Sequence, residues 1–190
     1  MNKARLEAFS DGVIAVIITI MVLELHVPHG VDLDSLRPVV PVFLVYVLSF
    51  VYLGIYWSNH HHMLHLVDRV NGAVLWANLH LLFWLSLIPF VTAWMGRNHY
   101  ASVPTAMYAV VMVLAAIAYE TLQFAIIRAQ GGDSQLARAI GADRKGKISL
   151  GFYVASIPLA FVQPMISDAI FVIVAGVWLI PDTRIERAVE

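Results

Sequence analysis

The stretch of sequence that decides the fold is Arg5-Leu6-Glu7-Ala8-Phe9-Ser10-Asp11-Gly12, which places charges and a hydroxyl at the start of an otherwise apolar helix. The apolar run that follows, residues 13–27, continues far enough to enter a bilayer. A carboxylate left alone in hydrocarbon costs about 3 kcal/mol on insertion scales. The stretch therefore predicts a membrane helix whose polar end contacts other protein groups.

The composition of the whole chain is that of an integral membrane protein. Hydrophobic residues make up 60% of the 190 residues and charged residues only 13%, about half the share found in average soluble proteins. The formal net charge of −1 provides no basic surface for nucleic acid, and we expect none to bind. Cysteine is absent, which excludes disulfides, thiolate nucleophiles and cysteine-based metal sites.

Six apolar stretches are predicted to cross the bilayer in one all-α domain that covers residues 1–190. A helix needs roughly 20 apolar residues to span a hydrocarbon core of about 30 Å. Pro158 and Pro164 interrupt the last apolar region, where we expect a hairpin that turns near Gln163; five spans or one kinked helix are the alternatives. The predicted spans are residues 6–27, 39–57, 72–95, 104–128, 147–165 and 166–180.

Basic residues in the connections predict the orientation, because short cytoplasmic loops accumulate Lys and Arg. With six spans, only Arg37 and Arg97 fall on the outer side, so both termini are predicted to be cytoplasmic. Residues 129–146 are expected to form a surface loop with one amphipathic turn. The basic residues expected on the cytoplasmic side are Lys3, Arg5, Arg69, Arg128, Arg138, Arg144, Lys145, Lys147, Arg184 and Arg187.

The predicted first helix has two chemically different faces. One face is apolar apart from a hydroxyl and suits either a packed core or the wall of a narrow pore. Asp11 lies far around the helix from that face and needs polar partners. Ile14 and Ile18 are expected to face lipid, and Glu24 is expected to be a solvated charge near the outer end. The members of the apolar face are Val16, Thr19, Ile20 and Leu23.

A buried polar network is predicted at the cytoplasmic end of this helix. Ser10 and Asp11 lie at the membrane depth where the second helix is expected to end and the third to begin, and Arg5 is expected to balance charge nearby. The third helix carries Asn71, Asn78 and His80 near its start. The network is predicted to contain Arg5, Phe9, Ser10 and Asp11 of the first helix together with Trp57, Asn59, His60, His61, His62 and His80.

Metal, cofactor and enzyme readings have little support in the sequence. His61 and His65 are one helical turn apart, as two zinc ligands can be, but no third ligand is specified, so we expect no structural metal site. A pH-sensing role of these histidines is an alternative. No nucleophile and base pair or phosphate-binding glycine loop stands out, so neither an enzyme nor a bound cofactor is expected. The tryptophans interpreted as packing or interface anchors rather than as a ligand cage are Trp76, Trp84, Trp94 and Trp178.

The motif formed by Arg5, Phe9, Ser10, Asp11 and Gly12 resembles the first helix of the bacterial branch of the transmembrane protein 175 potassium-channel family. The similarity extends through residues 13–25 and to the Trp, Asn and His residues of segment 57–62. The resemblance implies a homotetramer in a bacterial plasma (inner) membrane, without a soluble partner, in which four first helices surround a K⁺ pathway. The Thr-Val-Gly-Tyr-Gly filter of ordinary potassium channels is absent from the sequence.

The resemblance also implies roles for the apolar face of the first helix. Val16, Ile20 and Leu23 are expected to form rings that narrow the pore and gate it by excluding water, and K⁺ is expected to pass near the Thr19 hydroxyls. A hydroxyl that only bonds the carbonyl one turn earlier is the alternative for Thr19. The Arg, Ser and Asp of the motif are expected to hold helices together rather than to coordinate the ion.

A secondary or proton-coupled cation transporter is the alternative function. It would use ionisable groups within the membrane, for which Asp11, His80 and Glu120 are the candidates. A carrier needs a conformational cycle for each ion, whereas a channel does not, so transport rate separates the two.

Overall fold

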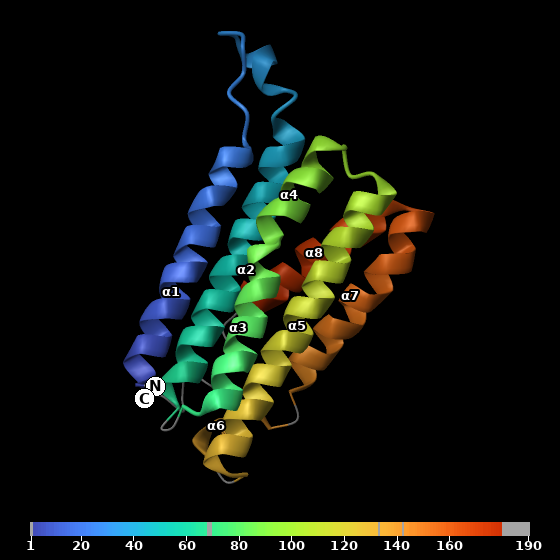
Figure 1. Cartoon of the computed structure of the whole chain (residues 1–190). Helices are drawn as coiled ribbons and strands as arrows, with labels where there is room; N and C mark the ends of the chain where they lie inside the picture. Colours follow the sequence, from blue (N-terminus) through green and yellow to red (C-terminus); the bar gives the residue numbers. More distant parts are fainter. Residues whose placement is uncertain (1, 68–69, 133, 142, 180–190) are drawn as a thin grey trace.

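The computed structural model describes residues 2–67, 70–132, 134–141 and 143–179, and these residues form an all-α bundle (Figure 1). Long helices run side by side in alternating directions, joined by short connections. The first helix lies at one edge of the bundle and the seventh at the opposite edge. The helices are α1 Lys3–Ile20, η1 Met21–Glu24, η2 Leu33–Leu36, α2 Val40–His65, α3 Gly72–Ser86, α4 Ile88–Arg97, α5 Ser102–Gln130, α6 Gln135–Ile140, α7 Arg144–Val162 and α8 Pro164–Leu179.

Side-chain caps begin several of these helices at the positions where the chain leaves a connection. Asn71 accepts a hydrogen bond from the backbone N–H of Val74 at 2.9 Å and starts α3. Asp143 accepts from the backbone N–H of Gly146 at 3.2 Å and starts α7. Such caps satisfy backbone donors that have no partner inside the helix. The short helix α6 occupies the loop 129–146, where one amphipathic turn was expected.

The predicted third span consists of two successive helices that run in the same direction. α3 and α4 are separated at Leu87, and Pro89 follows two residues later. Proline has no N–H to donate to the carbonyl four residues earlier and its ring crowds that turn, so the helix is interrupted there. Together the two helices form one apolar segment, Gly72–Arg97, that is long enough to cross a membrane, in agreement with the span predicted over residues 72–95.

The second helix is longer than its predicted span. It continues to His65, so the segment from Trp57 to His62 lies inside α2 and not at its end. Several of the polar side chains in this segment bond to carbonyls of their own helix, as Asn59 does to Ile55 at 2.9 Å. These bonds let a polar stretch remain helical, which the hydropathy of the sequence did not indicate.

The hairpin expected near the C-terminal prolines is confirmed. α7 ends at Val162, Gln163 is extended with φ −156° and ψ 103°, and α8 begins at Pro164. Proline disfavours helical backbone in the residue before it and is well tolerated at the first position of a new helix. Pro158 lies inside α7 without ending it.

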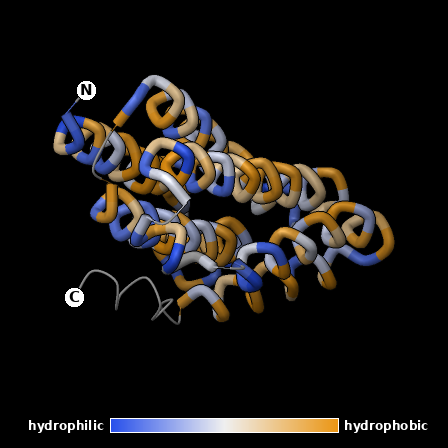
Figure 2. Tube along the Cα trace, turned by 90° about the horizontal axis from the view of Figure 1, so that it is seen from below, coloured by the Kyte–Doolittle hydropathy of each residue, from blue (hydrophilic) through white to orange (hydrophobic). Residues whose placement is uncertain are grey.

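Within the part of the chain that the structure describes, four helical segments are long and apolar enough to cross a membrane: Lys3–Glu24, Val40–His65, Gly72–Arg97 and Ser102–Gln130. α8 is apolar but shorter. Large hydrophobic side chains are exposed on most of the helices, and in Figure 2 hydrophobic positions, drawn in orange, lie on the outer sides of the helices as well as between them. A bundle with an apolar exterior of this kind is a multi-pass membrane protein.

The two ends of the bundle differ in charge. Lys3 Nζ donates to the carbonyl of His65 at 2.6 Å, and the Gln130 amide donates to the carbonyl of Leu66 at 3.0 Å. The start of α1 and the ends of α2 and α5 therefore meet at one end of the bundle. α6 and the basic start of α7 lie at the same end (Figure 1). Arg97 lies at the other end, where α4 finishes. Among the basic residues of the predicted orientation, Arg69, Arg184 and Arg187 lie outside the described residues.

Candidate functional site: the exposed face of the first helix

α1 buries only one of its faces against the bundle. It packs on α2 and α3, and the buried side chains are 4% exposed or less. They recur every three or four residues, as expected for one stripe of an α-helix. The members of this buried stripe are Leu6, Ser10, Ile14, Ile17 and Met21.

The face predicted to line a pore is the uncovered one. Val16 is 56% exposed, Ile20 42% and Leu23 76%, and Thr19 is exposed between them. Phe9 of the motif lies on this side as well and is 51% exposed. Because α1 forms the edge of the bundle, nothing from the described part of the chain covers these side chains (Figure 1).

Ile14 and Ile18 do not face lipid as expected. Ile14 is fully buried and belongs to the hydrophobic core, and Ile18 is partly buried and packs against that core. Helical periodicity gives the angle between two side chains but not which side a neighbouring helix covers. α2 and α3 take the side of Ile14, which leaves the Val16 side open.

A change of helix type aligns the two outermost apolar positions. α1 tightens into the 3₁₀ helix η1 after Ile20, and Leu23 belongs to η1. Residues three apart eclipse one another in a 3₁₀ helix, whereas three α-helical steps leave them about 60° apart. Ile20 and Leu23 therefore point in nearly the same direction.

The Thr19 hydroxyl is bonded to its own helix and still has lone pairs to offer. Oγ1 lies 3.0 Å from the carbonyl oxygens of both Ala15 and Val16 and donates its hydrogen to them. A hydroxyl carries one donor and two acceptor positions, so the oxygen can also accept from water or contact a cation. The alternative, in which the Thr19 hydroxyl bonds to its own backbone, therefore holds for the hydroxyl hydrogen. The hydroxyl oxygen remains available on the exposed face of α1.

A buried chain of hydrogen bonds joins α1 to α2 and α3. The His60 ring donates from Nε2 to Asn78 Oδ1 at 2.7 Å, and Asn78 Nδ2 donates to Ser10 Oγ at 2.9 Å. Ser10 Oγ in turn donates to the carbonyl of Leu6 at 2.8 Å. All three side chains are 1% exposed or less. Each link satisfies a polar group that would otherwise be buried without a partner.

Asn78 is the member of this chain that sequence reasoning did not assign. It lies in the middle of α3, two residues before His80, which was chosen instead. The signal that favours Asn78 is its position among apolar residues of α3: Val74 and Leu81 share its buried side. A polar residue on the apolar face of a membrane helix requires a partner inside the protein.

Asp11 has a separate and more exposed partner. Trp57 donates from its indole N–H to Asp11 Oδ1 at 3.0 Å, which ties α1 to α2 beside the buried chain. The Trp57 ring is stacked on His61, with centroids 6.1 Å apart and planes at 28°. Asp11 is only partly buried. The single predicted network therefore consists of two separate sets of hydrogen bonds, a buried one through Ser10 and Asn78 and a more exposed one between Asp11 and Trp57.

Other residues predicted for the network bond elsewhere. His80 is exposed and accepts from the Trp84 indole N–H at 2.8 Å, so it does not join Ser10 or Asp11. Asn59 bonds to its own helix, as does His62, whose Nδ1 lies 2.7 Å from the carbonyl of Ser58. Arg5 is exposed on the uncovered side of α1.

Glu24 is paired rather than free. Arg97, at the end of α4, donates to Glu24 Oε2 at 2.6 Å, and both side chains are partly exposed. The Glu24 side chain is solvent-exposed as expected, and the packing of α4 beside η1 adds an arginine partner that is distant in sequence. The ion pair ties the segment beyond Leu23 to the bundle.

Among the described residues, His, Asp and Glu side chains do not gather in threes as metal ligands would. His61 and His65 lie with ring centroids 6.3 Å apart, and His61 also neighbours the rings of Trp57 and His62 on α2. This geometry is one of packed rings along a helix.

Membrane-length helices and an apolar exterior define a multi-pass membrane protein, and the described residues leave one stripe of its edge helix uncovered. Residues 5–89 match the family described as "Endosomal/lysosomal potassium channel TMEM175". "Potassium channel HX13_20290" of Chryseobacterium sp. (strain P1-3) is 53% identical over 190 residues, which are 100% of this chain and 99% of that one. The chain therefore belongs to the TMEM175 family, and it is an ion channel and not an enzyme.

Two further relatives agree with this assignment. "Potassium channel B446_29190" of Streptomyces collinus is 36% identical over 137 residues, which cover 67% of this chain and 66% of that one. The crystal structure of "a lysosomal potassium-selective channel TMEM175 homolog" from Chamaesiphon minutus matches with a TM-score of 0.81 and 28% identity. That match covers 95% of this chain and 97% of the other, so the whole bundle shares the fold.

Proposed function

We propose that this chain is a potassium channel of a bacterial inner membrane, built as a homotetramer in which four α1 helices surround the ion pathway. The observation that carries the proposal is the exposure of one stripe of α1, comprising Val16, Thr19, Ile20 and Leu23, on a helix that its own bundle covers only from the other side. A single helix cannot enclose a pathway, whereas symmetric copies around an axis can. The names of the bacterial relatives supply the ion, K⁺.

The proposed gate is hydrophobic. Four copies of Ile20 and of Leu23 around an axis would form apolar rings, which exclude water when narrow and admit it after a small displacement of the helices. Val16 would form a third ring further in. Thr19 would contribute a ring of hydroxyl oxygens that replaces part of the hydration shell of K⁺, in place of the carbonyl filter that the sequence lacks.

The proposed topology is one domain of six membrane spans with both termini in the cytoplasm. α7 and α8 would form the fifth and sixth spans, although α8 has only 16 residues. The support for this orientation is the basic end of the bundle, where Lys3 lies close to the end of α2 and α7 begins with Arg144 and Lys145.

Planar-bilayer recordings of the purified chain test the proposed function. In asymmetric KCl and NaCl, the reversal potential should lie toward the K⁺ equilibrium potential, with single-channel steps far above the turnover of a carrier. The mass of the protein in detergent, corrected for bound detergent, should equal four chains. A conducting monomer would refute the proposed pore, and flux without resolved channel steps would favour a transporter.

The transporter alternative has less support in the geometry. Asp11 bonds to Trp57 and His80 to Trp84, while Glu120 lies on α5 with Asp143 in a different part of the bundle. A proton-coupled carrier needs its ionisable groups along one route. These three groups have separate surroundings.

A further inference from the structure

A second site lies away from α1, in a partly enclosed pocket between α2, α5, α7 and α8. Its volume is about 60 Å³, room for on the order of four water molecules or one small organic group. Its lining comes from those four helices and the residue before α7, and no residue of α1 contributes to it. The pocket is therefore separate from the stripe proposed to line the pore.

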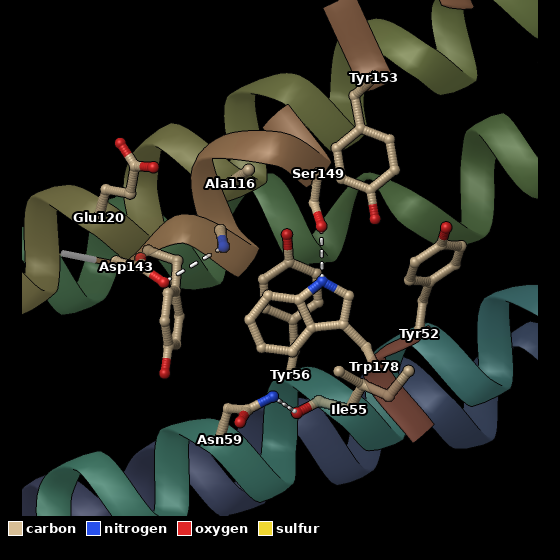
Figure 3. A pocket seen from close by; sticks show the side chains of 12 residues that line it. Tyr52, Ile55, Tyr56, Asn59, Ala116, Glu120, Asp143, Ser149, Tyr153 and Trp178 are labelled. Carbon is tan, nitrogen blue, oxygen red and sulfur yellow. Dashed lines mark hydrogen bonds between the residues drawn. The ribbon is translucent and has the colours of Figure 1, made fainter. Parts of the chain in front are cut away.

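Aromatic rings form the walls of this pocket. Tyr52 and Tyr153 meet edge to face with centroids 6.1 Å apart, and Tyr56 meets Tyr119 in the same way at 6.1 Å. Trp178 also lines the pocket, and Figure 3 shows its ring near the centre of the view. Rings of this kind present negative faces that attract cations, most strongly those with weak hydration.

The Trp178 ring is held in place and already accepts a cation. Its indole N–H donates to Ser149 Oγ at 2.8 Å, and Ser149 Oγ donates to the carbonyl of Lys145 at 2.8 Å. The Lys145 ammonium lies 4.5 Å from the centre of the Trp178 ring, within the distance of a cation–π contact. Lys145 itself is not among the residues that line the pocket.

Two carboxylates complete the lining. Figure 3 shows Glu120 and Asp143 at one end of the pocket and Tyr52 and Tyr153 at the other, with Trp178 and Tyr56 between them. Asp143 also caps α7 by accepting from the backbone N–H of Gly146 at 3.2 Å. The basic side chains of this segment do not line the pocket: Arg144 and Lys147 are exposed, although Lys147 lies close enough for its charge to act on Glu120.

We propose that this pocket binds a quaternary ammonium group, with the methylated nitrogen against Trp178 and the tyrosine rings and the countercharge supplied by Glu120 and Asp143. Aromatic walls favour a cation that sheds water readily, the volume suits one trimethylammonium group, and the carboxylates disfavour anions. Free choline and the head group of a choline lipid share this chemistry. The assignment of Trp178 as a packing anchor is thereby extended to a ligand-binding role.

The test is a calorimetric titration of the full chain, purified in maltoside, with choline at constant ionic strength. 3,3-Dimethylbutan-1-ol has the shape of choline without its charge and is the matched control ligand. Choline should bind about tenfold more tightly than this neutral analogue. Equal affinity for the two would overturn the proposal and indicate an apolar site for lipid chains.

Variants locate the binding. Glu120→Gln and Asp143→Asn remove charge with little change of shape, and Asn retains the cap of α7, so each should weaken choline binding about fivefold. Trp178→Leu should weaken it by a similar factor, and Lys147→Gln should strengthen it. Thr19→Val, on the proposed pore face, should leave choline affinity unchanged. No binding to the folded chain, or the same affinity in Glu120→Gln and Asp143→Asn, would overturn the proposal.

The source of the group is distinguished by bilayer composition. The same titration in nanodiscs of phosphatidylglycerol should reproduce the detergent result. If lipid head groups are the natural occupants, nanodiscs of phosphatidylcholine should lower the apparent affinity for free choline by competition. An unchanged affinity in phosphatidylcholine would assign the pocket to a soluble ammonium ligand.

Discussion

Asn78 donates to the hydroxyl of Ser10 at 2.9 Å in a site where both side chains are fully buried, and this bond fastens the proposed pore helix to α3. Asn78 also accepts a hydrogen bond from the His60 ring, so its side-chain amide links α1, α2 and α3. Asn78→Leu would leave both partners buried without their bonds, and each such loss costs about 1–3 kcal/mol. We expect thermal unfolding in detergent to shift down accordingly.

A double-mutant cycle isolates this bond. Ser10→Ala and Asn78→Leu should each destabilise the protein, and together they should cost less than the sum, with a coupling of about 0.5–3 kcal/mol. Asn59→Ala, which removes an amide bonded only to its own helix, is the matched control and should change stability little. Strict additivity would contradict the bond between Ser10 and Asn78.

Asp11 is expected to act on assembly rather than on ion preference. Asp11→Ala removes the acceptor of the Trp57 indole N–H, a bond to a charged group that is worth about 1.5–3 kcal/mol when well formed and less at this partly exposed position. Trp57→Phe should lower the fraction of tetramer in size-exclusion chromatography to a similar extent. A variant of Asp11 that assembles normally but loses K⁺ preference would place this carboxylate on the ion pathway instead.

Substitutions at the apolar rings should open the pore. Ile20→Asn or Leu23→Asn adds groups that hold water where the rings would exclude it, so the open probability in single-channel recordings should rise. Ile173→Asn on α8, at a side chain that is 60% exposed, is the matched control and should leave gating unchanged. Unaltered gating in both ring variants would refute the assigned constriction.

Thr19→Val tests the hydroxyl with almost no change of shape. If the oxygen contacts K⁺, the permeability ratio of K⁺ to Na⁺ should change, because part of the replaced hydration shell is lost. If the hydroxyl serves only the carbonyls of Ala15 and Val16, the ratio should stay the same while stability shifts by less than about 1 kcal/mol. Reversal potentials under bi-ionic conditions separate these outcomes.

Gly96 is a position where two helix backbones approach closely. A Cβ at Gly96 of α4 would lie 2.6 Å from Val42 Cα of α2, so Gly96→Ala forces the helices apart and should destabilise the protein by about 1–3 kcal/mol. Gly54→Ala is the matched control, because a Cβ there meets no atom within 4 Å. That variant should be neutral or slightly stabilising, since alanine favours helix.

The sequence was a good guide to where helices lie and a poorer guide to what covers them. Hydropathy identified the apolar segments, and Pro164 marked the hairpin, because both signals are local. Ile14 and Val16 are equally apolar, so only the packing of α2 and α3 decides that one is buried and the other exposed. The same limit explains the choice of His80 over Asn78 and the missed pairing of Glu24 with Arg97, which depend on neighbours distant in sequence.

The switch from α-helix to 3₁₀ helix after Ile20 also sets a length. A 3₁₀ helix rises about 2.0 Å per residue instead of about 1.5 Å, so Leu23 lies about 6 Å beyond Ile20 along the axis rather than about 4.5 Å. In the proposed tetramer, the rings of Ile20 and Leu23 would then enclose a dry, cylindrical length of pore and not a single narrow ring. The work of filling such a cylinder with water grows with its length. A helix that relaxed from 3₁₀ to α geometry would shorten the cylinder by about 1.5 Å and turn Leu23 about 60° away from Ile20. Both changes would lower the barrier to water, so conduction would depend on the pitch of this one turn.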